Sequence, residues 1–469
     1  MSTPEITPVQ AELARTPTDA AIPRTHHGKY WIEDWRPEDP DFWTEKGARI
    51  AKRNLIFSVF SEHIGFSVWS MWSVLVLFLG PEYGIDAAGK FLLTALPTLL
   101  GAVLRLPYTF AVGTFGGRNW TIVSALLLLI PTVGIAIVLQ PGVSYGTLLF
   151  VACLAGVGGG NFASSMTNIN AFYPARLKGR ALGINAGGGN IGVPAVQLVG
   201  LLILATIGAG HPRVLALVYL PLIIAAAIGS AVRMNNLTEM RNAKHAMRDV
   251  AKQAHTWIIS LLYIGTFGSF IGFSFAFGQV LQVQFADVFA TPVRAAYLTF
   301  IGPLIGSLIR PVGGILADRL GGARVSFVNF VAMALGAVVV LVASMMQSLP
   351  LYMVGFIMLF TFSGVGNGSV YKMIPAIFRA KSGLEITRHG ADPAASMAKS
   401  QRYAGALIGI AGAVGAFGGV LVNLAFRQSF LATKSAEAAY IAFIVFYAVC
   451  FVVTWYVYLR ASAKRLDGV

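Results

Sequence analysis

Two arginines inside long apolar runs are the side chains of this sequence best suited to do chemistry. Arg105 and Arg310 each lie four residues after a glycine and eleven residues before a pair of glycines. An arginine at membrane depth costs about 2.5–3.5 kcal/mol or more, and it normally faces a cavity or a partner. Because the two arginines occupy matching places in two halves of the chain, they predict one anion-binding site on an internal symmetry axis.

An alternative applies to both arginines, since each side chain can also extend its charged end to the lipid headgroups. Two observations argue against this alternative. Each arginine lies well inside its apolar run, and the arrangement occurs twice. The sequence therefore favours a buried site.

The composition implies that lipid surrounds most of the chain. Of its 469 residues, 56% are hydrophobic and 12% are charged, whereas about a quarter of a soluble protein is charged. Long apolar runs predict membrane-spanning helices, so we expect an all-α membrane protein. The 35 Lys and Arg residues exceed the 20 Asp and Glu residues, as in proteins with basic cytoplasmic loops. We therefore expect the lipid bilayer, and no nucleic acid, as a partner.

The apolar runs number about twelve, each long enough to cross the bilayer. They form an N-terminal half over 55–234 and a C-terminal half over 256–460, joined by a basic linker over 235–255. Tails cover 1–54 and 461–469. The runs lie near 55–79, 88–112, 119–139, 144–170, 179–207, 213–234, 256–281, 294–317, 324–346, 350–377, 400–426 and 438–460.

Basic residues gather in the loops on one side of the predicted bundle. Arg118, Arg180, Arg319 and Lys381 are examples, and the loops of the opposite side carry fewer. Cytoplasmic loops are enriched in Lys and Arg. We therefore expect both termini on the cytoplasmic face of the cell (inner) membrane.

Two different segments precede the first span. Residues 1–29 are rich in Pro, Thr and Ala and predict a disordered tail. Trp31, Trp35 and Trp43 follow among charged residues. Tryptophans in such a setting are typical of the half-wet headgroup layer of a membrane, where we expect this segment to lie.

The loop that follows Arg310 carries Asp318, Arg319 and Arg324 around a pair of glycines. The glycines permit a tight turn, and the charged residues can tie neighbouring helix ends together. This loop resembles the GxxxDRxGxR motif of the major facilitator superfamily, with one extra residue before the last arginine. The corresponding loop of the N-terminal half, beside Gly116, matches this motif only in part. The alternative interpretation is an ordinary glycine turn.

Glycine-rich runs in the fifth and eleventh spans allow helix backbones to approach closely in lipid. Helix packing alone is the alternative explanation for most of these glycines. Asn190 differs, because an amide surrounded by glycines needs a partner. Its NH2 group can donate to an anion oxygen, so we expect Asn190 to contact the substrate.

Five segments together resemble the nitrate/nitrite porter family of the major facilitator superfamily. The resemblance implies alternating-access transport of nitrate and nitrite by a monomer. It implies that Arg105 and Arg310 clamp the anion, that Asn190 contacts it and that Tyr263 hydrogen-bonds to it. The rings that bracket the anion map to Phe66, Phe162 and Phe267, for which core or lipid-facing packing is the alternative. The segments are Asp34–Pro40, Asn161–Met166, Gly187–Gly192, the glycine-rich eleventh span and both arginine segments.

Three titratable residues in the spans fall outside these family motifs. Glu62 and His63 lie early in the first span, and Lys372 lies late in the tenth. Since a lone charge at that depth is costly, we predict a Glu62–Lys372 ion pair that helps to close the cytoplasmic side. Proton coupling through Glu62 or His63 is a second hypothesis. A third is that His63 only caps a neighbouring carbonyl.

The sequence favours nitrate/nitrite antiport, with nitrate/proton symport by the same fold as the alternative. A nitrate-sensing receptor is disfavoured because the short tails carry no recognisable output domain. No nucleophile–base set, paired catalytic carboxylates, nucleotide loop or metal-ligand cluster is visible, so we expect neither an enzyme nor a bound metal or cofactor. Cys153 and Cys450 lie in apolar runs and are interpreted as small buried hydrophobic residues.

Overall fold

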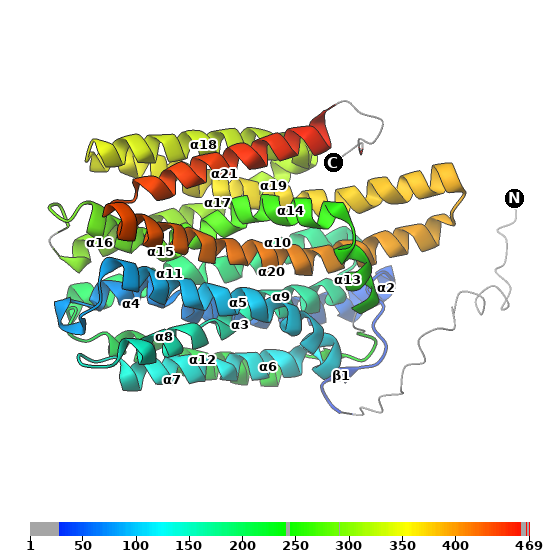
Figure 1. The fold of residues 1–469 in the computed structure, drawn as a ribbon. Helices are drawn as coiled ribbons and strands as arrows, with labels where there is room; N and C mark the ends of the chain where they lie inside the picture. The colour runs from blue at the N-terminus through cyan, green and yellow to red at the C-terminus, as the bar shows by residue number, and fades with distance from the viewer. Residues whose placement is uncertain (1–27, 241–243, 290, 461–465, 467–468) are drawn as a thin grey trace, which may run out of the picture.

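A computed structural model describes residues 28–240, 244–289, 291–460, 466 and 469. Most of the two predicted tails, including residues 1–27, lies outside these described residues. The helices run lengthwise through one bundle, in which the N-terminal half lies largely below the C-terminal half in Figure 1. The described chain is therefore the all-α bundle that its apolar runs predict.

The N-terminal half contains six predicted spans, four of which are divided by a short break. A break lets the helix axis bend, and several breaks fall at or beside glycine. The segments are α3 (Ala48–Ser70) and α4 (Trp72–Phe78), α5 (Ala87–Phe115), α6 (Gly117–Leu127) and α7 (Leu129–Val138), α8 (Tyr145–Leu154) and α9 (Val157–Phe172), α10 (Ala175–Asn190) and α11 (Gly192–Thr206), and α12 (Arg213–Arg233).

The C-terminal half repeats this plan after a short linker helix, α13 (Lys244–Ala251). Its first span contains one π-helical turn, η3, which matters for the site described below. The segments are α14 (Ala254–Tyr263), η3 (Ile264–Gly268) and α15 (Ser269–Gln284), α16 (Pro292–Thr299) and α17 (Ile301–Leu320), α18 (Gly322–Met345), α19 (Leu349–His389), α20 (Pro393–Thr433), and α21 (Glu437–Thr454) with η4 (Trp455–Leu459).

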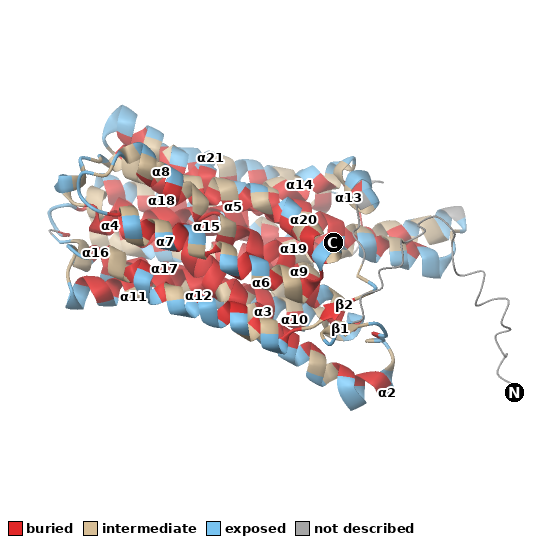
Figure 2. Cartoon of the chain, turned by 90° about the horizontal axis from the view of Figure 1, so that it is seen from below, coloured by how far each residue is buried: buried red, intermediate tan, exposed pale blue. Residues whose placement is uncertain are grey.

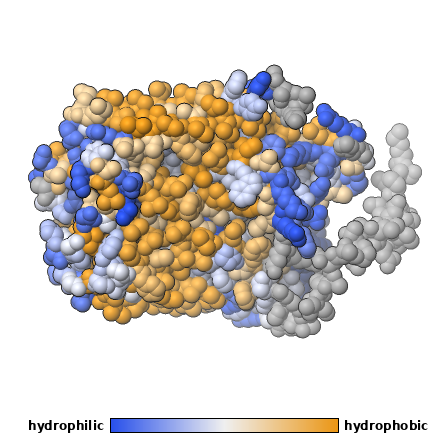
Figure 3. Space-filling view, viewed as in Figure 1, coloured by the Kyte–Doolittle hydropathy of each residue, from blue (hydrophilic) through white to orange (hydrophobic). Residues whose placement is uncertain are grey.

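Eleven helices of the described chain are long and apolar enough to cross a membrane. On the face seen in Figure 3, a broad apolar surface lies between two more hydrophilic ends of the bundle. The first predicted span, 55–79, is also helical, as α3 and α4, but Glu62, His63 and several serines make it less apolar. It lies in the interior, where residues 64–79 are all buried (Figure 2).

The two arginine segments end in the same backbone turn. Gly116 and Gly321 each lie eleven residues after their arginine, with φ angles of 88° and 90°. These angles are strained for any residue with a side chain. The next helix starts at the second glycine of each pair, Gly117 or Gly322. The repeat in the sequence is therefore also a repeat in the backbone.

The predicted loop between the tenth and eleventh spans is wrong in its extent. α19 and α20 each run for 41 residues, and they project past the bundle as a helical hairpin (Figure 1). The turn uses Gly390, with φ 62°, and the Asp392 side chain, which accepts from the Ala395 amide at 2.7 Å. Hydropathy marks only the apolar part of a helix that can lie within the membrane, so it misses this polar extension.

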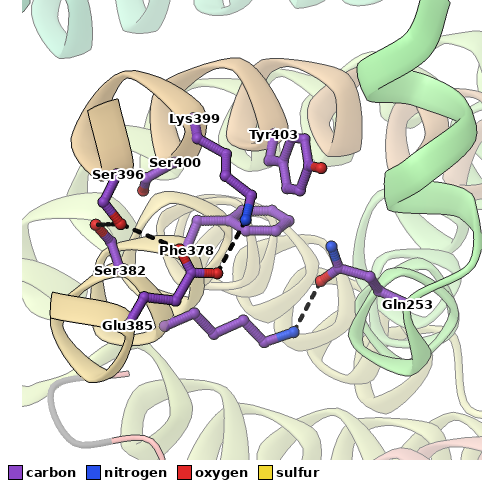
Figure 4. Close-up of a pocket in the computed structure, with 9 residues that line it drawn as sticks. Gln253, Phe378, Ser382, Glu385, Ser396, Lys399, Ser400 and Tyr403 are labelled. Carbon is purple, nitrogen blue, oxygen red and sulfur yellow. Dashed lines mark hydrogen bonds and ion pairs between the residues drawn. The ribbon is translucent and has the colours of Figure 1, made fainter. Parts of the chain in front are cut away.

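Polar side chains line a pocket at the base of this hairpin, beside the start of α14 (Figure 4). Lys399 pairs with Glu385 at 3.0 Å, and the Ser382 hydroxyl donates to that of Ser396 at 3.0 Å. Both contacts join α19 to α20, so they hold the two arms of the hairpin together.

The Trp-rich segment packs on the bundle, and its expected position in the headgroup layer stays a prediction. The strand β1 (Trp31–Ile32) pairs in parallel with β2 (Asn236–Leu237) from the linker. Trp35 and Trp43 are buried, with ring centroids 5.3 Å from Phe172 and 5.6 Å from Tyr173. These two rings are therefore packed against aromatic side chains at the end of α9.

Candidate anion-binding site

Arg105, on α5, is completely buried at the interface of the two halves. Its Nε donates to the carbonyl of Gly159 at 3.2 Å, and its Nη1 donates to the carbonyl of Gly412 at 2.7 Å. Gly159 belongs to the N-terminal half and Gly412 to the C-terminal half. The guanidinium also lies 4.7 Å from the Phe162 ring centroid and 4.8 Å from that of Phe267. Backbone and rings thus hold this charge at a fixed position.

Arg310, on α17, reaches the same place from the other half. Its Nη2 donates to the hydroxyl of Tyr263 at 3.3 Å. Its guanidinium lies 6.0 Å from the Phe162 centroid and 5.6 Å from the Tyr371 centroid. Both arginines therefore lie against one ring, that of Phe162, as a single shared site requires.

The π-helical turn η3 positions two of the aromatic side chains. Tyr263 immediately precedes this turn and Phe267 lies within it, and their rings stack with centroids 5.2 Å apart. Phe267 also stacks on Phe162 at 6.1 Å, and Phe66 joins the group through Phe162 at 6.2 Å. π-Helical turns are rare and often occur at functional sites. This one points a tyrosine and a phenylalanine toward the arginine pair.

Several buried N–H groups at this site have no hydrogen-bond partner among the described residues. They include Nη2 of Arg105 and Nη1 of Arg310. Buried polar groups in proteins are nearly always paired, and an unpaired charged donor is especially costly. One unpaired donor on each arginine, beside a common ring, is the arrangement that a small anion with several acceptor oxygens satisfies.

Asn190 is the last residue of α10, next to the break at Ile191. It is buried, and both ends of its amide lack a partner in the described chain. Gly192, just after the break, packs against Phe66, so this part of the span lies beside the aromatic group. Asn190 does not hydrogen-bond to either arginine, and its role stays a prediction.

The predicted Glu62–Lys372 ion pair is wrong in this structure. Lys372 bonds Asp318, with Nζ 2.8 Å from the nearer carboxylate oxygen, and this pair is largely exposed. Glu62 is buried, and one oxygen of its carboxylate accepts from Ser165 and Asn185. The sequence showed the depth of these residues in their spans, but the face of the helix decides which partner each one meets.

His63 lies beside Glu62 on α3 but turns to another helix. Its Nδ1 is 3.2 Å from the carbonyl oxygen of Gly188 on α10. Only the ring can donate in such a contact, so the geometry fits the interpretation that His63 caps a neighbouring carbonyl.

One of the contacts between helices that the Asp318–Arg324 loop motif predicts is present. Asp318 joins the end of α17 to Lys372 on α19. Arg319 and Arg324 are exposed, and they stay candidates without an assigned contact.

Sequence reasoning missed Tyr371. Its ring lies 5.9 Å from that of Tyr263 as well as against Arg310, and its buried hydroxyl has no partner in the described chain. The sequence signal that could have indicated Tyr371 is its position next to Lys372 in the same predicted span. Consecutive helical residues point in directions about 100° apart, so one faces the site while the other faces Asp318.

Comparisons with known proteins show the family of the chain. A model of the Major Facilitator Superfamily matches residues 55–384. The chain is 37% identical over 460 residues to "Nitrate/nitrite transporter NarU" of Salmonella typhimurium, an alignment that covers 94% of this chain and 98% of the relative. It is 34% identical to "Probable nitrate/nitrite antiporter NarK2" of Thermus thermophilus, with 93% and 98% covered.

Solved structures of transporters share the fold at low sequence identity. A D-xylose–proton symporter matches with a TM-score of 0.63 and 14% identity, over 89% of this chain and 99% of that chain. A bacterial homologue of the lysosomal transporter Spinster, in an inward-facing conformation, matches with a TM-score of 0.61 and 16% identity, over 87% and 96%. From the matched model and the long alignments, the chain belongs to the major facilitator superfamily and, within it, to the nitrate/nitrite porter family of membrane transporters.

Proposed function

We propose that this protein carries nitrate and nitrite across the cell membrane, exchanging one for the other. One observation carries the proposal: Arg105 and Arg310 each keep an unpaired N–H beside the same Phe162 ring. The names of the relatives, which mention nitrate, nitrite and antiport, support the choice of anion and of exchange.

The chemistry of nitrate suits these side chains. Nitrate is flat, singly charged and weakly hydrated. A planar guanidinium offers two parallel donors to two oxygens of such an ion, which a lysine ammonium does not. Phe162 and Phe267 exclude water, which strengthens each contact between a charge and its partner. Asn190, Tyr263 and Tyr371 are further donors for the third oxygen.

Exchange follows from the two positive charges. Two arginines in a site that closes away from water repel one another, and a bound anion removes part of this repulsion. The loaded carrier then changes its orientation more readily than the unloaded one. Net transport in one direction would require the return of an unloaded site, so one anion leaves as another enters.

We further propose that both termini lie in the cytoplasm and that the protein works as a monomer. The gathering of basic residues in one set of loops supports this orientation. The site is formed within one chain, since α5 supplies Arg105 and α17 supplies Arg310, so a second copy is not needed for it.

Counterflow in proteoliposomes tests the proposal. Vesicles loaded with nitrite should accumulate labelled external nitrate much faster than anion-free vesicles, and chloride or formate inside should not replace nitrite. Runs at two pH values separate exchange from proton symport, in which a pH gradient alone drives nitrate uptake. Equal nitrate entry into anion-free and nitrite-loaded vesicles, with no pH gradient, contradicts exchange.

A further inference from the structure

A small polar chamber lies inside the N-terminal half, where α3, α6 and α9 meet. It has room for a single water-sized particle. Glu62 is the one charged residue among those that line it. The rest carry hydroxyl or amide groups, and the full lining is Ser58, Ser61, Glu62, Thr121, Ser124, Asn161, Ser164 and Ser165.

The two oxygens of the Glu62 carboxylate have different surroundings. Oε2 accepts hydrogen bonds from the Ser165 hydroxyl and from Asn185 Nδ2, the latter at 2.7 Å. Oε1 is buried and has no partner among the described residues. The carboxylate is therefore oriented on one side and unpaired on the other.

Further oxygen atoms around Glu62 are unpaired as well. In the chamber they are the hydroxyls of Ser58 and Ser61 and the amide oxygen of Asn161, whose Nδ2 is unpaired too. The amide oxygen of Asn185, which lies beside the chamber and bonds Glu62 through its Nδ2, is also unpaired. Each of these residues is at most 3% exposed. Serines in membrane helices usually bond a carbonyl one turn earlier, and the Ser58 and Ser61 hydroxyls lack such a bond. A cluster of unpaired acceptors in one chamber indicates a ligand that takes several oxygens at once.

Charge points to a cation. A buried carboxylate without a paired positive charge is costly at membrane depth, and no ion pair of the described chain involves Glu62. Arg105 and Arg310 are near enough to act on it electrostatically, but Arg105 hydrogen-bonds to the carbonyls of Gly159 and Gly412, and Arg310 to Tyr263. His63, the neighbouring titratable residue, faces the Gly188 carbonyl.

We propose that this chamber binds a small alkali cation of the Na⁺ class. Carboxylate, hydroxyl and amide oxygens are the ligands that hard cations prefer. One carboxylate balances one positive charge, which favours a monovalent ion, and the small chamber excludes organic cations. A proton on Oε1 needs one acceptor only, so it leaves at least one of the Ser58 and Ser61 hydroxyls unpaired.

The chamber lies close enough to the anion site for a bound cation to influence anion binding. This coupling rests on the proposed function. Gly189 of α10 packs directly on the Glu62 carboxylate, and the next residue is Asn190. A cation here also attracts an anion held by the nearby arginines. Because coupling between two ligands is reciprocal, Na⁺ should raise nitrate affinity and nitrate should raise Na⁺ affinity.

Thermal unfolding of the purified full-length protein tests the site without any transport assay. The unfolding midpoint is measured in NaCl, KCl and choline chloride at equal ionic strength, without nitrate. At a hundredfold excess over Kd we expect Na⁺ to raise the midpoint by roughly 5 °C relative to choline. Glu62→Gln should remove the rise, whereas Glu385→Gln, a matched change on the α19–α20 hairpin, should keep it.

A second variant tests the site if Glu62→Gln fails to fold. Ser61→Ala removes one oxygen and should weaken Na⁺ binding several-fold while Glu62 stays in place. Equal midpoints of the wild-type protein in Na⁺, K⁺ and choline overturn the proposal. A midpoint that follows pH in all three salts, and does so only while Glu62 is present, assigns a proton to the chamber and also overturns the alkali-cation site. Neither result depends on nitrate transport, which the counterflow assay tests separately.

Discussion

The two arginines come from equivalent places in the repeat, yet their surroundings differ. Arg105 is fixed by two backbone carbonyls, one from each half, and it has no solvent exposure. Among the described residues, the Arg310 side chain has one hydrogen bond, to Tyr263 of its own half, and Arg310 is 8% exposed. Repetition of a sequence motif thus places two charges symmetrically, whereas local contacts give them different freedom.

This difference suggests a division of labour. Arg105 ties the halves together at the level of the site, because its partners Gly159 and Gly412 belong to different halves. Arg310 is held by tyrosines and can adjust to the anion. In a carrier whose halves rock around a central site, the first arginine serves as a fixed point and the second follows the substrate.

Replacement of the fixed arginine should have the largest effect. Arg105→Lys keeps the charge, but a compact ammonium lacks the planar, spread donors with which the guanidinium reaches both carbonyls and the anion. We expect nitrate affinity to fall by about 100-fold or more, which corresponds to about 2.8 kcal/mol, and counterflow to be abolished. Binding is measured by titration calorimetry. A variant with wild-type affinity contradicts the role of Arg105.

Replacement of the freer arginine should have a smaller effect on binding. Arg310→Lys loses the forked geometry but breaks only the bond to Tyr263, so we expect a loss of about 10- to 100-fold. Counterflow should again be abolished. Comparison of the two variants in the same titration tests the asymmetry directly. A larger loss for Arg310→Lys than for Arg105→Lys reverses the assignment of fixed and mobile partners.

Removal of the tyrosine hydroxyls should separate their contributions. Tyr263→Phe leaves Arg310 Nη2 without its partner, and a hydrogen bond to a charged group contributes about 1.5–3 kcal/mol. We expect about a tenfold loss of affinity, and a loss of a few-fold for Tyr371→Phe, which keeps the ring against Arg310. If the two losses add in the double variant, the hydroxyls act independently, as two donors to different atoms should.

Disruption of the Asp318–Lys372 pair should have the smallest effect. An exposed ion pair contributes about 0–1 kcal/mol, so Lys372→Met should change transport less than about threefold. Asp318→Asn is the matched change on the partner residue. A strong defect in both variants, relieved when the charges are exchanged, would show that this pair gates transport.

The sequence predicted the repeat from local patterns, and it predicted the candidate site from these patterns together with the family resemblance. Arg105, Arg310 and the glycine pairs have fixed spacing, and the family resemblance placed Phe162, Tyr263 and Phe267. The structure brings these five side chains together. Hydropathy also predicted the bundle, since lipid selects for apolar runs of a given length.

Other features depend on contacts that no local pattern encodes. Lys372 and Tyr371 are neighbours in the sequence, and only the packing of α19 decides which of them faces the arginines. Trp35 and Trp43 carry the signature of a membrane interface, but rings at the end of α9 bury them. The sequence did not predict the long hairpin of α19 and α20, because its polar residues are also typical of a loop.

The central claim is that two arginines, one from each repeat, hold one oxyanion between them. An experimental structure of the protein with bound nitrate measures this directly. We expect the anion beside Phe162, with one oxygen accepting from Arg105 Nη2 and another from Arg310 Nη1. A nitrate that contacts one arginine alone, or that lies elsewhere while both N–H groups stay unpaired, would contradict the account.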